Sequence, residues 1–122
     1  MKKLLFICAL MLMSAGMQAQ GISHIETTRS WYYIYDQAGK KVKTLSSNIG
    51  ELQGYSASLI VVKSGSWYYL YDSKGNKIKA MSASTVGKVL SVAGDTFTSQ
   101  VGSWIYTWNK EGKKIATRVA QR

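Results

Sequence analysis

The chain has 122 residues, with no proline, one cysteine and one histidine, and this length allows one small domain. A single histidine excludes a histidine-rich metal site. Sixteen lysine and arginine residues against six aspartate and glutamate residues give a formal net charge of +10. That excess favours anionic partners, such as acidic glycans, lipid headgroups or nucleic acid.

The N-terminus has the order of an export signal. Two lysines precede an apolar run over residues 4–13, and small residues then lead to a candidate cleavage site after Ala19. The run is shorter than the roughly 20 residues that span a bilayer. We therefore expect a signal peptide over residues 1–19, one mature domain over 20–122, a secreted or periplasmic location and no transmembrane segment after cleavage. The mature domain then has no cysteine and a formal charge of +8, because both leader lysines are lost.

Three segments of the mature chain align without gaps, and their starts lie 36 and 37 residues apart. Each begins with Trp and carries Asp or Asn five residues later, Gly eight later, Lys ten later and Val or Ile eleven later. Such a period indicates one structural unit used three times. The segments are 31–42, 67–78 and 104–115, within repeats over about 22–48, 49–85 and 86–122.

Each aligned segment predicts a β-hairpin. Aromatic and β-branched residues dominate its first arm, and an Asp-x-x-Gly connection supplies a side chain that caps a turn and a glycine free to adopt positive φ. In the second arm, lysines alternate with an aliphatic residue, which predicts a half-exposed strand with Lys41 and Lys43 on one face. The predicted turn residues are Asp36, Asp72 and Asn109, followed by Gly39, Gly75 and Gly112.

Further strands are expected ahead of each hairpin, over residues 23–28, 59–63 and 96–101, and a fourth precedes two of these at 50–55 and 87–92. The first copy lacks this leading strand. No mature segment has helical periodicity of useful length. The sequence therefore predicts an all-β fold of three repeated antiparallel β-meander units, each of 36 to 37 residues.

Four short strands per repeat, with Trp near the start of the third and Asp or Asn at its end, resemble a blade of the tryptophan-aspartate repeat β-propellers. Residues 89–109 and the following 112–115 carry this resemblance. The chain departs from that family in its shorter period, its lack of a Gly-His pair and its three units, since closed propellers typically have about 4 to 8 blades. The resemblance implies a propeller-like fold, and two chains of three units would close a six-bladed homodimer.

Two other resemblances compete. Residues 65–76 are similar to the choline-binding repeats of cell-wall proteins, whose aromatic hairpins cage a quaternary ammonium group. Those repeats are about half as long and carry a second Gly-Trp. The three four-stranded units also resemble a β-trefoil, a common lectin scaffold, and this is the alternative to the propeller-like arrangement.

The inventory of chemical groups predicts no enzyme. His24 is the only histidine and has no mature cysteine to pair with, so a cysteine nucleophile is excluded. Three acidic residues fall in predicted turns and the other three are isolated in the sequence. We expect no catalytic residue, no cofactor and no metal site.

The aromatic rings at positions zero, two and four of each aligned segment share one strand face. One interpretation is that this face is the core between neighbouring sheets. The other is that some of the rings are exposed and stack on sugars or on cationic headgroups. The candidate ligand-binding residues are Trp31, Tyr32, Trp67, Tyr68 and Trp104, with Lys41, Lys77 and Lys114.

These observations favour a non-catalytic binding module for a glycan or an anionic envelope surface, because repeated weak sites on one scaffold gain avidity. The alternative is a structural or protein-interaction component of the cell envelope, which would use exposed strand edges and the basic face to bind a protein partner.

Overall fold

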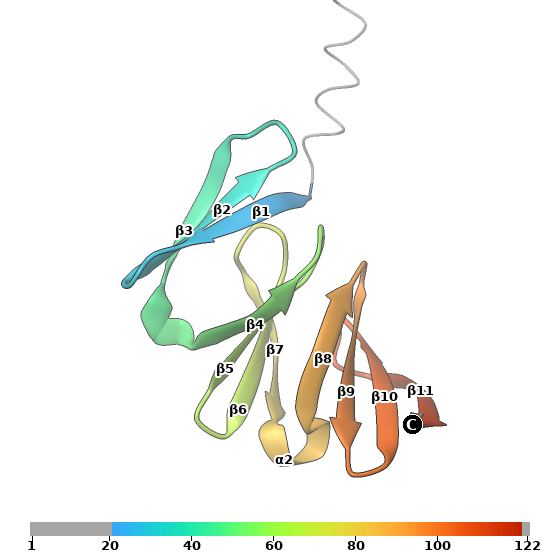
Figure 1. Ribbon diagram of the computed structural model, residues 1–122. Coiled ribbons are helices and arrows are strands. Elements are labelled where there is room, and N and C mark those ends of the chain that lie inside the picture. The colour runs from blue at the N-terminus through green and yellow to red at the C-terminus, as the bar shows by residue number, and fades with distance from the viewer. Residues whose placement is uncertain (1–20, 121–122) are drawn as a thin grey trace, which may run out of the picture.

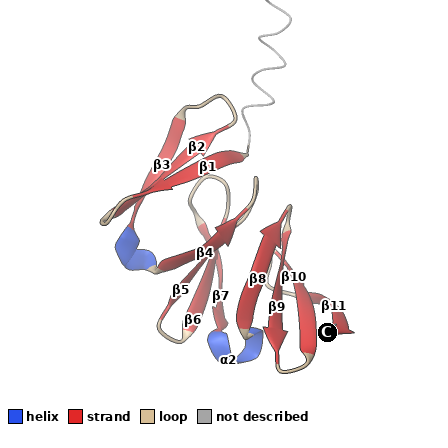
Figure 2. Cartoon of the chain, in the orientation of Figure 1, coloured by secondary structure: helices blue, strands red, loops and turns tan. Residues whose placement is uncertain are grey.

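The computed structural model describes residues 21–120 and contains three antiparallel meanders joined by short helical turns (Figures 1 and 2). The predicted signal peptide over residues 1–19 lies outside the described residues. The first sheet comprises β1 (Ile22–Thr27), β2 (Trp31–Asp36) and β3 (Lys41–Ser46). The second comprises β4 (Glu51–Tyr55), β5 (Ile60–Ser64), β6 (Trp67–Tyr71) and β7 (Lys77–Ser82). The third comprises β8 (Lys88–Ala93), β9 (Thr96–Val101), β10 (Trp104–Asn109) and β11 (Lys114–Val119).

This architecture confirms the predicted fold class. Every neighbouring pair of strands is antiparallel and consecutive in the chain, so each unit is a meander, and the first unit lacks the leading strand. Over residues 21–120 the three sheets stay separate and close no barrel. The β-trefoil alternative, which requires a barrel, is therefore wrong for the described chain.

The hairpin turns form as the sequence predicts. The Asp36 side chain accepts hydrogen bonds from the backbone nitrogens of Ala38 and Lys40, both at 2.9 Å. Asp72 and Asn109 make the same pair of contacts in the other units. The glycine that follows has a φ of 82°, 84° or 81° in the three units, a region in which only glycine is unstrained. The predicted turn residues are thus structural.

Short helical turns join the units: η1 (Ser47–Ile49) before the second sheet and α2 (Ala83–Val86) before the third (Figure 2). Each ends at a glycine with positive φ, Gly50 or Gly87. A Cβ on Gly50 would lie 2.6 Å from the carbonyl oxygen of Lys63, and one on Gly87 would lie 2.3 Å from that of Gln100. Backbone therefore approaches backbone too closely here for any other residue.

The sheets pack face to face, and the core lies in two layers between them. The layer between the first and second units includes Ile34, Ile60 and Val62. The layer between the second and third includes Tyr68, Leu70 and Phe97 with other apolar side chains. The middle sheet is therefore covered on both faces: one face packs against the first sheet and the other against the third.

This stacking revises the expected role of the aromatic face. Position four of the second and third units does pack in the core, since Tyr71 and Trp108 are 8% and 5% exposed, and the position-two rings Tyr69 and Tyr106 are partly buried against it. The opposite face contributes at least as much, with Ile34 and Leu70 fully buried. The tryptophans at position zero, in contrast, stay exposed. The core therefore uses both faces of the hairpin, because a stacked sheet has a neighbour on each side.

The first and third sheets each have one face that packs against no other sheet of the described chain, and we call these the outer faces. They carry polar residues at positions where the second unit has buried apolar residues. In the first unit, His24 and Glu26 pair with β2 at the places where the second unit has the buried Ile60 and Val62. In the third unit, Thr98 stands opposite Thr107, at the places of the buried Val61 and Leu70. Four buried apolar residues of the second unit therefore have polar residues at the equivalent positions of the outer units: His24 for Ile60, Glu26 for Val62, Thr98 for Val61 and Thr107 for Leu70. Terminal units of a repeat array commonly have such polar outer faces.

Candidate functional site

Three tryptophans in equivalent positions form the most regular exposed feature of the molecule. Trp31, Trp67 and Trp104 begin β2, β6 and β10 and are 45%, 47% and 47% exposed. Large aromatic side chains are usually well buried in a domain of this size. Near-equal exposure in three units shows that the same local geometry keeps each ring at the surface.

That geometry comes from the turn before each tryptophan. In the second and third units the turn contains Gly65 or Gly102 at a φ near 60°, and in the first unit the Thr28 hydroxyl accepts from the Trp31 backbone nitrogen at 3.0 Å. The carbonyl oxygen of the residue before each tryptophan then accepts a hydrogen bond of 2.7 to 2.9 Å. The donor is the backbone nitrogen of the residue that follows the last strand of the same unit, which is β3, β7 or β11. Each ring is therefore held at a corner of its sheet.

A lysine lies over the aromatic ring two residues after each tryptophan. The Nζ atom of Lys41 is 4.7 Å from the centre of the Tyr33 ring, and Lys77 lies at the same distance from Tyr69. In the third unit, Lys114 is 3.9 Å from the Tyr106 ring. Such cation–π contacts contribute about 0.5 to 1 kcal/mol at exposed sites. They hold each ammonium group beside an aromatic surface.

A β-bulge at the same place in each unit makes this contact possible. The register shifts between Ile34 and Tyr35, so that Lys43 stands opposite Ile34 while Lys41 stands opposite Tyr35. The extra residue, Val42, turns Lys41 onto the aromatic face and leaves Lys43 on the other. The prediction that both lysines share one face is therefore wrong, because a bulge interrupts the alternation. Corresponding shifts occur before Tyr71 and Trp108.

We call each set of tryptophan, tyrosine and lysine a Trp–Tyr–Lys triplet. The triplets contain six of the eight candidate ligand-binding residues and three tyrosines that the candidate list left out. Within each triplet the lysine contacts the tyrosine, whereas the tryptophan begins the strand and the lysine pairs towards its other end, as Lys41 does with Tyr35. The triplets are Trp31, Tyr33 and Lys41; Trp67, Tyr69 and Lys77; and Trp104, Tyr106 and Lys114.

The other two candidate residues, Tyr32 and Tyr68, connect the units to one another. The Tyr32 hydroxyl donates to the carbonyl oxygen of Gly50 at 2.7 Å, and the Tyr68 hydroxyl donates to that of Gly87 at 2.7 Å. Tyr68 is only 2% exposed. Both hydroxyls are thus used inside the protein, and we leave these two tyrosines out of the candidate surface.

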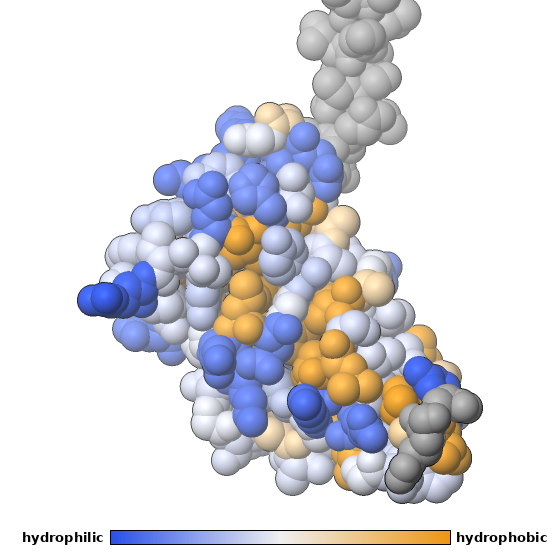
Figure 3. Space-filling view, viewed as in Figure 1, coloured by the Kyte–Doolittle hydropathy of each residue, from blue (hydrophilic) through white to orange (hydrophobic). Residues whose placement is uncertain are grey.

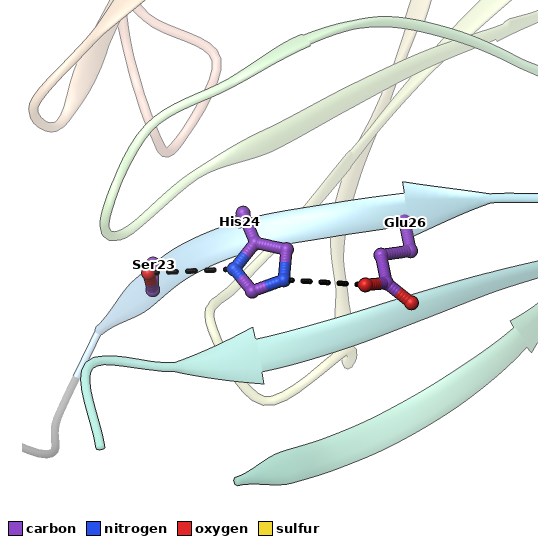
Figure 4. Close-up of polar contacts among 3 residues, drawn as sticks. All are labelled: Ser23, His24 and Glu26. Atoms are coloured by element: carbon purple, nitrogen blue, oxygen red, sulfur yellow. Dashed lines mark hydrogen bonds and ion pairs between the residues drawn. The ribbon is translucent and has the colours of Figure 1, made fainter. Parts of the chain in front are cut away.

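The outer face of the first unit carries a second polar cluster that the sequence prediction missed (Figure 4). The His24 ring stacks on the Tyr35 ring with 4.7 Å between centres, and its Nε2 atom lies 3.7 Å from a Glu26 carboxylate oxygen. Burial raises the pKa of Tyr35, and the nearby Glu26 carboxylate raises it further. Comparison of the aligned repeats would have found this cluster, since His24 and Glu26 replace apolar residues.

Among residues 21–120, no group of three His, Cys, Asp or Glu side chains is placed to hold a metal ion. No helix within those residues is long and apolar enough to cross a membrane. A scan against models of known protein families and a search among curated proteins both found no match. The triplets are therefore the feature of the described chain that bears most directly on function.

Proposed function

We propose that the protein is an exported, non-catalytic binding module that recognises an acidic glycan of the cell envelope or extracellular space through its three Trp–Tyr–Lys triplets. The supporting observation is the near-equal exposure of Trp31, Trp67 and Trp104, at 45 to 47%. A flat indole ring with a polar edge is suited to stacking on the apolar face of a sugar. Three such rings in equivalent surroundings offer three similar contacts.

The lysine of each triplet favours an acidic ligand. Lys41, Lys77 and Lys114 are all exposed, and each extends over an aromatic ring of its own triplet. A glycan that stacks on the tryptophan and continues along the strand therefore reaches an ammonium group over the tyrosine two residues on, which suits a carboxylate, sulfate or phosphate substituent. The net positive charge of the whole chain would also speed the approach of a polyanion.

Repetition gives this surface its expected binding behaviour. A polymeric glycan that occupies one triplet raises the effective concentration of its own neighbouring residues at the next. We therefore expect weak binding of short acidic oligosaccharides and much tighter binding of long ones. This pattern would distinguish the repeated surface from a single deep pocket.

The test is a titration of the mature protein with acidic polysaccharides chosen from a glycan array. A variant with Trp31, Trp67 and Trp104 changed to Ala should lose binding, whereas each single change should weaken it less. The matched control changes three other exposed apolar residues to Ala, namely Val42, Leu90 and Ile115, which are 41%, 44% and 53% exposed. Equal loss in both triple variants would contradict the proposal.

The role of charge has its own comparison. Changing the three triplet lysines to Gln should reduce affinity more than the same change at Lys40, Lys74 and Lys113, which lowers the net charge equally. Those control lysines are exposed but make no cation–π contact among the described residues. A silent array together with one saturable protein partner from envelope extract would instead favour the protein-interaction alternative.

A further inference from the structure

In the sheet of the first unit, β1 is an edge strand. In each of the other two sheets, a fourth strand pairs beyond the strand that corresponds to β1. In the second unit β4 pairs along β5, and in the third unit β8 pairs along β9. Over residues 21–120, no strand pairs with the corresponding edge of β1. The first sheet therefore presents an open edge at a position that is filled twice elsewhere in the same molecule.

The backbone of β1 presents hydrogen-bonding groups at this edge. The Thr28 backbone nitrogen donates to the carbonyl oxygen of Trp31 at 2.8 Å, which makes these two residues a hydrogen-bonded pair with β2. Such pairs alternate along an antiparallel ladder, so the N–H and C=O groups of Ile25 and Thr27 point away from β2. Neither residue has another backbone partner within the described part of the chain.

An apolar surface lies beneath the open position. In the second unit, β4 passes so close to β8 that a Cβ on Gly54 would lie 2.9 Å from a methyl group of Val92. The repeat spacing puts Tyr55 at the place of Val92, so a strand beside β1 would pass over Tyr55 in the same way. Leu52 and Tyr55 are partly exposed, and hydrophobic side chains gather over β4 and β8 in Figure 3.

The aligned repeats also indicate which residues of this chain correspond to the missing strand. Counting back 36 residues from β4 reaches residues 15–19, which lie in the predicted signal peptide. Cleavage after Ala19 would leave only residues 20 and 21, the counterparts of the turn residues 56 and 57, ahead of β1. The mature chain would then have no residues of its own at the register of the missing strand.

We propose that the open edge of β1 binds an extended segment of a partner polypeptide, which adds as a fourth strand antiparallel to β1. Strand addition satisfies the free groups of Ile25 and Thr27 and covers the apolar surface around Tyr55. This interaction is separate from the proposed glycan binding, because it uses no residue of a Trp–Tyr–Lys triplet.

The neighbouring unit indicates the chemistry of the segment. Gly54 stands opposite Val61 in the second unit, and the repeat spacing puts Ile25 at the place of Val61. A glycine or another small residue is therefore required opposite Ile25, since the chain there lies against Tyr55. The residue two positions earlier stands opposite Glu26, where a cross-strand basic side chain is favoured.

A synthetic peptide with the sequence of residues 50–56 and the change Leu52→Lys is the probe. We expect it to bind the mature protein, measured by fluorescence anisotropy, and to slow amide hydrogen exchange at Ile25 and Thr27. The same peptide with the further change Gly54→Val should bind about tenfold more weakly, because the added side chain meets Tyr55. Failure of the first peptide to bind, or equal binding by both, would overturn the proposal.

A proline in the protein gives an independent test. Thr27→Pro removes an N–H that points away from β2, so the first sheet is retained while strand addition is blocked. We expect this change to weaken peptide binding about tenfold or more. Thr44→Pro is the matched control, because the Thr44 backbone also points outward, from the other edge of the same sheet.

The control variant should bind the peptide as the parent does, with both melting temperatures measured. If Thr27→Pro does not fold, the two peptides and the hydrogen exchange of the parent protein still decide the question. Unchanged peptide affinity in a folded Thr27→Pro protein would overturn the proposal. Self-association that competes with the peptide would also overturn it, since the occupant would then be a second copy.

Discussion

The hydroxyl group of Tyr68 donates a hydrogen bond of 2.7 Å to the carbonyl oxygen of Gly87, the residue from which the next unit begins. Tyr32 makes the same bond to Gly50 one unit earlier. The third unit has Ile105 at this position, and no strand follows β11 in the described chain. A tyrosine thus occurs where a following unit supplies an acceptor, and an apolar residue occurs where none does.

We expect Tyr68→Phe to lower the free energy of unfolding by about 1 to 2 kcal/mol, because it leaves the Gly87 carbonyl group without its side-chain donor. Urea unfolding followed by tryptophan fluorescence measures this. Tyr33→Phe is the control, since the Tyr33 hydroxyl has no hydrogen bond among the described residues. Equal stability of the two variants would show that the bond between units contributes nothing.

The hairpin glycines allow backbone strain to be separated from contact between units. Gly39 and Gly75 have nearly the same φ, 82° and 84°, but a Cβ on Gly39 would meet nothing within 4 Å, whereas one on Gly75 would lie 2.7 Å from Cγ of Lys43. We expect Gly39→Val to destabilise by about 1 kcal/mol through the backbone alone. Gly75→Val should cost at least as much, since Lys43 must also move. Unchanged melting temperatures for both would contradict the turn assignment.

The sequence was sufficient to predict the units and their turns. The aligned Trp, Asp and Gly positions predicted each hairpin, and the turn contacts of Asp36 and its counterparts are local, so they depend on a few neighbouring residues. The missing leading strand of the first unit was also predictable, because strand count follows directly from the repeats.

The exposure of each ring could not be predicted from alternation alone. Whether a strand face is buried depends on which sheet packs against it, and Tyr68 and Trp67 differ in burial although they are neighbours. The bulge at Val42, which moves Lys41 to the aromatic face, also leaves no signal in the alternating pattern. The outer faces could have been recognised earlier, since His24 and Thr98 replace apolar residues of the second unit.

Removal of the leader is a separate prediction. We expect the exported protein to begin at Gln20 or within a few residues of it, because the apolar run and small residues before Ala19 have the order of a cleaved signal. Intact-mass measurement on protein from the medium or periplasm decides this. A mature chain that retains Cys8 with the added mass of a lipid would contradict it.

Alkaline pH should reveal the raised pKa of Tyr71, one of two buried tyrosines in the second unit. Burial raises the pKa of Tyr71, with a further contribution from Tyr69, so the folded state keeps the phenol proton above pH 10.0 while the unfolded state loses it. Stability is therefore unaffected by this group below about pH 10 and falls as pH rises beyond it. The fall should be shallower in Tyr71→Phe than in Tyr33→Phe, measured as unfolding free energy from pH 8 upward. Parallel curves would contradict this assignment.

The outer faces also bear on assembly. The resemblance to propellers implied a six-bladed homodimer, in which the third unit of one chain would pack on the first unit of another. Such an interface would press Thr98 and Thr107 against His24 and Glu26, in place of the apolar pairs that join the units within one chain. Burying those polar groups without matched partners is unfavourable.

We therefore expect the mature protein to be a monomer at tens of micromolar by sedimentation equilibrium. A variant that restores the inner-face residues at both ends, His24→Ile with Glu26→Val and Thr98→Val with Thr107→Leu, should associate if the ring geometry is accessible at all. A variant with the apolar substitutions in only the first or only the third unit serves as the control, because the interface between two chains would then still bury the polar residues of the other unit. A parent protein that is already dimeric, with association unchanged by substitutions at His24 and Thr98, would show that its partner contacts lie elsewhere than on these two faces.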